Sequence, residues 1–127
     1  MLNKKTLGDI GEIAAVQYLE SQGYNIIEKN FRCKLGEIDI IASDNDVIAF
    51  IEVKTRSSEL FGQPGEAVNH HKQRKIVKTA LAFISNKKLY DWMCRFDVVE
   101  IIADDSGNVI NINLIKNAFE YSGKYGY

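Results

Sequence analysis

The chain has 127 residues, of which 46% are hydrophobic and 26% are charged, and its formal net charge is −1. This length supports one domain with its own hydrophobic core, and the balanced composition excludes fibrous and intrinsically disordered classes. A net charge so close to zero will not attract nucleic acid by itself, so any phosphate-binding site has to be a local one.

No apolar run approaches the length that a bilayer requires, and the N-terminal string MLNKKTLGDIGE lacks an apolar signal core. We therefore expect a cytoplasmic protein without a membrane partner. Cys33 and Cys94 lie in unrelated sequence contexts and lack the paired spacing of a zinc site, which predicts that both are reduced, buried thiols.

The first predicted element is a helix over residues 6–22. Its apolar residues recur at helical spacing, namely Leu7, Ile10, Ala14 and Tyr18. Thr6 and Asp9 have the spacing of a capping box, and Gly23 ends the helix.

Runs rich in β-branched and aromatic residues predict three strands next, over residues 24–31, 37–42 and 47–54. The turn formers Asp44, Asn45 and Asp46 join the second and third of these strands in a hairpin. Residues 55–65 contain serine, glycine and proline, which predicts a surface loop.

A second helix is predicted over residues 68–85, with apolar residues on one face and basic residues at its start. Strands over residues 94–103 and 109–114 follow, joined by a turn at 105–108, and the tail from about residue 118 is predicted to be flexible. The predicted order αβββαββ indicates a single α/β domain over residues 1–127, with helices packed against one sheet.

Chemistry is expected on the predicted hairpin. Glu52 and Lys54 stand two residues apart on one strand, so their side chains leave the same face of the sheet. Asp39 shares that face if the hairpin turn has an even number of residues. A two-residue turn places Asp39 opposite Phe50, a four-residue turn places it opposite Glu52, and both alternatives stay open.

Two carboxylates within about 5 to 8 Å of each other repel, and a cation between them relieves the repulsion. Mg²⁺ prefers oxygen ligands and is often bound by one or two carboxylates together with substrate phosphate, which fits Asp39, Glu52 and the carbonyl of Val53. Lys54 could then position or deprotonate the attacking water, or balance charge that develops on the phosphate.

Glu12 on the first helix is a third candidate acid. Gly8 and Gly11 each weaken a helix by about 1 kcal/mol relative to alanine, so they suggest a close approach to the sheet edge that carries the acids. Such an approach would place Glu12 near the metal.

Each candidate also has a purely structural interpretation. Asp39 and Lys54 could form a cross-strand ion pair on a solvated face, and Glu12 could be an ordinary exposed helical acid. Asp97 is expected to pair with Arg95 or another base, with a catalytic role as the alternative. The basic run HHKQRK could be only a solvated helix face.

Five strings occur in order along nearly the whole chain: GDIGEIAAVQYLESQGY, GEIDIIA, IAFIEVKTR, GEAV and RFDVVEI. In this combination the sequence resembles the YraN family of uncharacterised bacterial proteins, which is similar to the PD-(D/E)XK nuclease superfamily. The superfamily signature is matched by Asp39, Glu52 and Lys54, often joined by a helical Glu, here Glu12. Its leading proline is replaced by Ile38.

This resemblance implies a restriction-endonuclease-like three-layer sandwich with a central mixed sheet, and hydrolysis of phosphodiester bonds with Mg²⁺ or Mn²⁺. The implied partner is nucleic acid, expected to be DNA such as branched or repair intermediates, and the implied assembly is a homodimer, as for many similar nucleases. Residues carried over as phosphate contacts are Thr55, Arg56, Lys72, Gln73 and Arg74.

Three functional hypotheses follow from the sequence. The first is a metal-dependent endonuclease, and the second is a nucleic-acid-binding adaptor that keeps the acids without turnover. The third is a protein-interaction domain whose aromatic tail docks on a partner or a second copy. Metal dependence separates the first two, because binding to the nucleic-acid backbone needs only basic residues and weakens steeply with salt.

Overall fold

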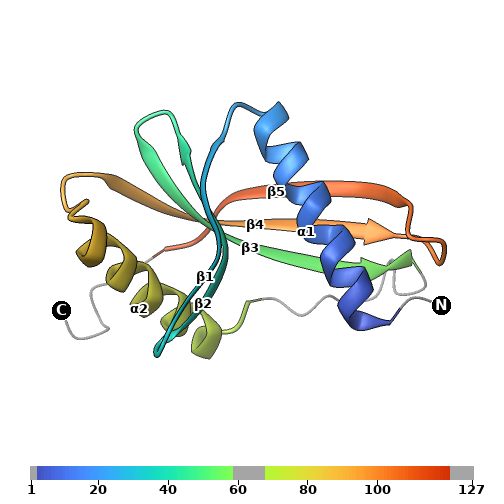
Figure 1. The fold of residues 1–127 in the computed structure, drawn as a ribbon, viewed down its shortest axis with the longest axis horizontal. Coiled ribbons are helices and arrows are strands. Elements are labelled where there is room, and N and C mark those ends of the chain that lie inside the picture. The colour runs from blue at the N-terminus through green and yellow to red at the C-terminus, as the bar shows by residue number, and fades with distance from the viewer. Residues whose placement is uncertain (1–2, 59–67, 121–127) are drawn as a thin grey trace.

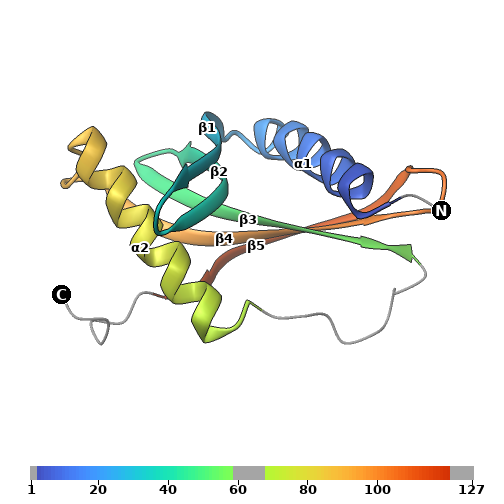
Figure 2. The ribbon, with the colours of Figure 1, turned by 60° about the horizontal axis from the view of Figure 1, so that its bottom comes forward.

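The computed structural model describes residues 3–58 and 68–120. In chain order these form α1 (Lys4–Ser21), β1 (Asn25–Cys33), β2 (Gly36–Asp44), β3 (Val47–Ser57), α2 (His70–Lys87), β4 (Met93–Ala103) and β5 (Val109–Phe119). The two helices lie on opposite faces of one sheet, as Figures 1 and 2 show. The predicted α/β three-layer arrangement and the order αβββαββ are therefore confirmed. Neither helix in the described ranges is long and apolar enough to cross a membrane.

Within the described residues the sheet has five strands in sequence order, and of these only β3 and β4 run parallel to each other. A parallel pair needs a long crossover, which α2 provides, whereas short turns suffice for the antiparallel pairs. In Figure 1 the β1–β2 hairpin swings away from the direction of β3, β4 and β5, so the sheet divides into a short wing (β1 and β2) and a long wing (β3 to β5).

Alternate residues of β3 enter two separate cores. Ile48 and Phe50 pack under α2, where they meet the buried Phe83. Ala49 and Ile51 face the other way, into the core beneath α1. Because successive strand residues point to opposite faces, one continuous apolar strand can supply both layers of the sandwich.

Helix α1 starts two residues before the predicted boundary. Its N-cap is Asn3, whose side-chain oxygen accepts a hydrogen bond from the Thr6 backbone N–H at 2.8 Å. The prediction that Thr6 and Asp9 form a capping box is therefore wrong, because Asn3 supplies an equally good capping oxygen further upstream. Asn69 caps α2 in the same way, by accepting from the Lys72 N–H at 2.9 Å.

All five strands are longer than the sequence predicts, and the extensions of β3 and β5 change the predicted loop and tail. β3 runs to Ser57 because its parallel pairing with β4 continues through Ser57 and Ala103, so the predicted loop does not begin at Thr55. β5 runs to Phe119, whose ring stacks on that of Phe96 with centroids 5.0 Å apart. The remainder of the predicted loop and of the predicted flexible tail falls on residues 59–67 and 121–127, outside the described residues.

Both cysteines are free thiols, as predicted. Cys33 ends β1 and is half-buried, whereas Cys94 lies near the start of β4 and is exposed. The prediction that both thiols are buried is therefore wrong, because each cysteine lies at or near the end of a strand.

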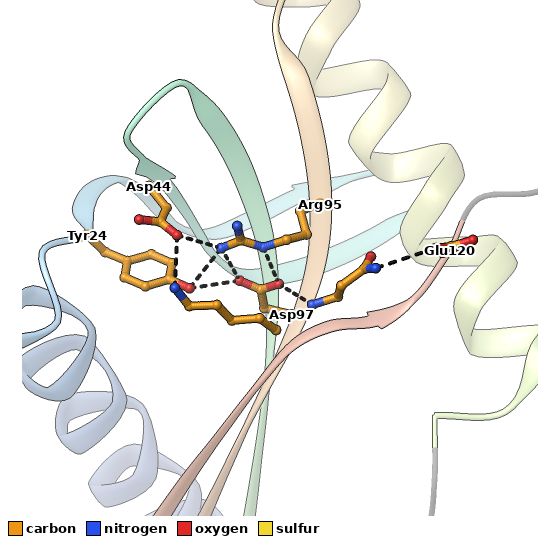
Figure 3. Close-up of polar contacts among 7 residues, drawn as sticks. Tyr24, Asp44, Arg95, Asp97 and Glu120 are labelled. Carbon is orange, nitrogen blue, oxygen red and sulfur yellow. Dashed lines mark hydrogen bonds and ion pairs between the residues drawn. The ribbon is translucent and has the colours of Figure 1, made fainter.

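A buried polar cluster fastens the sheet on its α1 side (Figure 3). Asp97, with a side chain 0% exposed, accepts hydrogen bonds from Arg95 Nε at 2.8 Å and from Tyr24 Oη at 3.0 Å. Arg95 also donates to Asp44 at the end of β2, and the Asn117 N–H of β5 donates to Asp97, each at 2.9 Å. The predicted pairing of Asp97 with Arg95 is confirmed. The cluster joins β2, β4, β5 and the segment that precedes β1.

The glycines of α1 offer a test of the helix–sheet contact. A Cβ on Gly11 would overlap the side chain of Thr55 on β3, whereas a Cβ on Gly8 would meet nothing within 4 Å. We expect Gly11→Ala to lower the free energy of unfolding by about 2 kcal/mol through overpacking. The control, Gly8→Ala, should raise it by about 0.5 to 1 kcal/mol through helix propensity. Urea unfolding measures both values, and equal effects of the two changes would contradict the close contact at Gly11.

Candidate functional site

The predicted acids lie where β2 parts from β3. The two strands pair from Asp44 and Val47 as far as Ile40 and Ile51. One further step in this register places Asp39 opposite Glu52, which is the register predicted for a four-residue turn. Asp44 and Val47 still pair, so the actual turn consists of Asn45, with φ of 57°, and Asp46.

At this point a side chain takes the place of the backbone carbonyl that would normally accept a hydrogen bond between the two strands. Asp39 Oδ2 accepts a hydrogen bond from the backbone N–H of Val53 at 2.8 Å. Since Val53 follows Glu52 directly, this bond fixes the Asp39 carboxylate beside that of Glu52. The structure thus brings Asp39, Glu52 and Val53 together where the pairing of β2 with β3 ends.

The two carboxylates are electrostatically strained. Burial and the neighbouring Asp39 together raise the pKa of Glu52 to about 7, although the charges of Lys72 and Lys54 oppose the shift. Burial likewise raises the pKa of Asp39 to about 6, against the lowering effect of the Val53 hydrogen bond. The pair therefore retains a proton at a pH where isolated carboxyls are fully ionised.

Glu12 stands close to this pair, and its role as a third metal ligand stays a prediction. Its charge contributes to the raised pKa of Asp39, so α1 does carry it toward the site as predicted. Its own pKa is raised, chiefly by burial and then by the charges of Asp9 and Glu37. Among residues 3–58 and 68–120, however, no three His, Cys, Asp or Glu side chains are grouped so that they could bind a metal ion together.

Asn30 is a residue of this site that the sequence analysis did not single out. It falls between the β1–β2 pairs Lys29–Ile40 and Phe31–Ile38, which places it opposite Asp39. It has a left-handed conformation with φ of 53°, and its side chain donates a hydrogen bond to Glu12. Asparagine is rare in strands and tolerates this conformation, so its presence inside a strand pattern was the available signal.

The donor set suits Mg²⁺ or Mn²⁺. Mg²⁺ keeps several waters and is commonly held by one or two carboxylates plus substrate phosphate, so two adjacent acids are sufficient. A divalent ion would also offset the burial and the nearby negative charges that raise the pKa of Asp39 and of Glu52. The Val53 N–H already binds Asp39, and the use of its carbonyl as a ligand stays a prediction.

The predicted phosphate contacts on α2 differ in their surroundings. Lys72 lies in the first turn of α2 and lowers the pKa of Glu52, so its charge acts on the site. Arg74 is exposed on the same helix. Gln73 Nε2 donates to the backbone carbonyl of Val68 at 2.7 Å, which engages its side chain at the start of α2.

The two predicted contacts on β3 lie apart from each other. Thr55 packs against Gly11 of α1, on the opposite face of the sheet from Lys54. Arg56 shares the face of Glu52 and Lys54, and its Nη2 is 2.9 Å from Glu100 Oε2 on β4. A phosphate would therefore have to compete with Glu100 for Arg56, and it could not meet Thr55 and Lys54 on one face.

The acid pair predicts a pH dependence of stability. Both folded-state pKa values lie above the ordinary carboxyl values, so the folded protein binds more protons than the unfolded chain between about pH 4 and 7. The free energy of unfolding should fall as pH rises through this window. Glu52→Gln should remove much of this slope and be more stable than the wild type at pH 8 without metal, by about 1 to 2 kcal/mol. Urea unfolding at pH 4, 6 and 8 measures the slope. If the free energy of unfolding changes with pH equally in the wild type and in Glu52→Gln, the acid pair is not electrostatically strained.

Sequence comparisons identify relatives of known family but not of known activity. The family model described as "Uncharacterised protein family UPF0102" matches residues 11–101. A UPF0102 protein of Caldicellulosiruptor saccharolyticus is 50% identical over 93% of this chain and 100% of its own length. UPF0102 proteins of Clostridium botulinum (strain Kyoto / Type A2) and Clostridium tetani are each 51% identical over 91% of this chain and 95% of theirs. The resemblance to the YraN family is confirmed by these matches, and the chain belongs to the uncharacterised protein family UPF0102.

Proposed function

We propose that this protein is a metal-dependent nuclease that hydrolyses phosphodiester bonds in nucleic acid, with DNA as the expected substrate. The observation that carries the proposal is the pair Asp39 and Glu52. Their carboxylates lie side by side at the parting of two strands, and each has a raised pKa. Strained acids of this kind are frequent at catalytic sites, because a structural role seldom requires two adjacent, half-buried carboxylates.

Each residue of the pair has a distinct task in this proposal. The hydrogen bond from the Val53 N–H fixes the orientation of Asp39, and Glu52 presents a second carboxylate from the neighbouring strand. A bound Mg²⁺ would supply charge that polarises a phosphoryl oxygen and acidifies a water molecule. Lys54 follows Glu52 on the same face, where its ammonium can orient the attacking water or stabilise negative charge on the phosphate.

The charge distribution of α2 supports a polyanionic substrate. This helix contains no acidic residue, and all of its exposed lysines and arginines except Lys87 lie in its first half, namely Lys72, Arg74, Lys75 and Lys78. Cations near a helix N-terminus are disfavoured by the helix dipole, so a bound polyanion would stabilise this arrangement. Lys72 links this cationic face to the acids through its effect on Glu52.

The same cationic face supports a second candidate function, a nucleic-acid-binding adaptor without turnover. Binding by this face needs neither acid, so it would persist in the absence of metal. The third hypothesis, docking through the aromatic tail, concerns residues 121–127, which lie outside the described residues. The tests below separate the nuclease from the adaptor.

Cleavage of single-stranded, duplex, flapped and four-way-junction DNA with Mg²⁺, Mn²⁺ or EDTA tests the proposed activity. We expect metal-dependent cutting that Glu52→Gln abolishes, because that change removes a metal-binding carboxylate. Lys54→Ala should keep metal affinity, measured by calorimetry, yet lose cleavage by at least about a hundredfold. Calorimetry should also find weaker Mn²⁺ binding in Asp39→Asn. Binding of DNA without cutting under every condition would favour the adaptor.

The salt dependence of DNA binding tests the cationic face of α2. Each lost phosphate contact lowers the slope of log K against log salt by about 0.7 to 0.9. The double variant Lys75→Ala/Lys78→Ala should therefore bind more weakly at low salt and show a slope smaller by about 1.5. A matched control, Lys4→Ala/Lys5→Ala, removes two exposed cations from α1 and should leave the slope unchanged. Equal slopes for all three proteins would place the phosphates elsewhere.

A further inference from the structure

A groove runs between α1 and β1, beside the acid pair. Its volume is about 510 Å³, within the range of small-molecule sites. Glu12 and Asn30 line it: Asn30 lies opposite Asp39 in the strand pairing, and the charge of Glu12 acts on Asp39. The groove and the candidate metal site therefore share one wall.

The walls of this groove combine an apolar surface with carboxamides. Ile13 of α1 is 62% exposed, although the rest of its helix buries its apolar face against the sheet. Gln17 lies one turn further along α1, and Asn30 faces the groove from β1. Carboxamide side chains both donate and accept hydrogen bonds, so this lining matches a flat, neutral group with polar edges.

The charges of the groove disfavour a phosphate inside it. Asp9 and Glu12 line it against a single cation, Lys29. A phosphate group would meet repulsion there, in contrast to the acid-free face of α2. The neutral part of a nucleotide, its base, meets no such penalty, and Lys29 could contact the phosphate of an adjacent nucleotide from the edge of the groove.

Asn30 is held in a conformation that costs free energy. Non-glycine residues rarely adopt positive φ, and such strain persists where the surrounding structure enforces it, often at functional sites. Here the strain coincides with the skipped pair opposite Asp39 and with the hydrogen bond to Glu12. The conformation brings the Asn30 carboxamide to the wall shared by the groove and the acids.

We propose that this groove binds one unpaired base of the nucleic-acid substrate, next to the bond that is cut. Ile13 contacts the face of the base, while Gln17 and Asn30 hydrogen-bond to its edge. The inference rests on the proposed function for the identity of the substrate, and it narrows the substrate class to single-stranded or flapped nucleic acid. A base inside a duplex is stacked and paired, so it cannot enter such a groove without being extruded.

Binding of single-stranded DNA in EDTA tests the groove separately from catalysis. A fluorescently labelled oligonucleotide is compared with a series of copies that each carry one abasic position, by anisotropy. In the wild type we expect one position at which loss of the base weakens binding about five- to tenfold, as expected for the loss of about 1 kcal/mol or somewhat more. The double variant Ile13→Ala/Asn30→Gly should bind the intact strand and this abasic strand with equal affinity. That affinity should be as low as the affinity of the wild type for the abasic strand.

Glycine is chosen at position 30 so that loss of the side-chain contact can be distinguished from a change in backbone conformation. Glycine accepts a positive φ, so Asn30→Gly removes the carboxamide without forcing the backbone to change. Asn45 also has positive φ but lies in the β2–β3 turn, so Asn45→Gly is the matched control and should keep the abasic effect.

Two results would overturn the inference. One is a wild type that binds no single-stranded DNA, or binds every abasic strand as well as the intact one. The other is a double variant that keeps the full abasic effect. If the abasic effect is found but Mg²⁺ supports no cleavage, only the proposed catalysis fails. If Mg²⁺-dependent cleavage is found without any abasic effect, only the groove assignment fails.

Discussion

The hydrogen bond from the Val53 N–H to the Asp39 carboxylate is the interaction on which the arrangement of the site depends. A strand ladder would normally satisfy this N–H with a backbone carbonyl, and the two strands would stay together. Here a side chain satisfies it instead, so β2 can turn away with β1 while β3 continues with β4 and β5. The same bond places one carboxylate beside another, so the division of the sheet and the acid pair have a common origin.

The two helices place side chains of opposite charge on the two sides of the acid pair. α1 contributes Glu12 and the acidic wall of the groove, whereas α2 contributes only cations, of which Lys72 acts on Glu52. The net charge of −1 is therefore small although acidic residues beside α1 and basic residues on α2 are locally separated. At the far end of the short wing, the buried cluster of Tyr24, Arg95 and Asp97 links the residue before β1 to β4 through hydrogen bonds. The two wings are therefore held together at this end and separate from each other toward the acid pair.

Patterns that depend on neighbouring residues allowed most of the fold to be predicted from the sequence. The element order, the Asp39–Glu52 face and the Arg95–Asp97 pair follow from periodicity of two or 3.6 residues. Features that depend on contacts between residues far apart in the sequence could not be predicted. Thr55 reads as the start of a loop because its strand pairing depends on β4, and the place of Asn30 beside the acids depends on the pairing of β1 with β2. Whether the acid pair binds metal is a question of affinity, which no residue pattern contains.

The unusual partner of the Val53 amide has a consequence for hydrogen exchange. Most strand amides are protected by carbonyl oxygens, whose basicity changes little with pH, whereas this amide is protected by a carboxylate that titrates near pH 6. Protonation of Asp39 weakens an acceptor that the rest of the ladder does not use. The protection of this single backbone hydrogen, relative to its intrinsic exchange rate at each pH, therefore reports the ionisation of the acid pair from within the sheet, without any substrate or enzymatic assay.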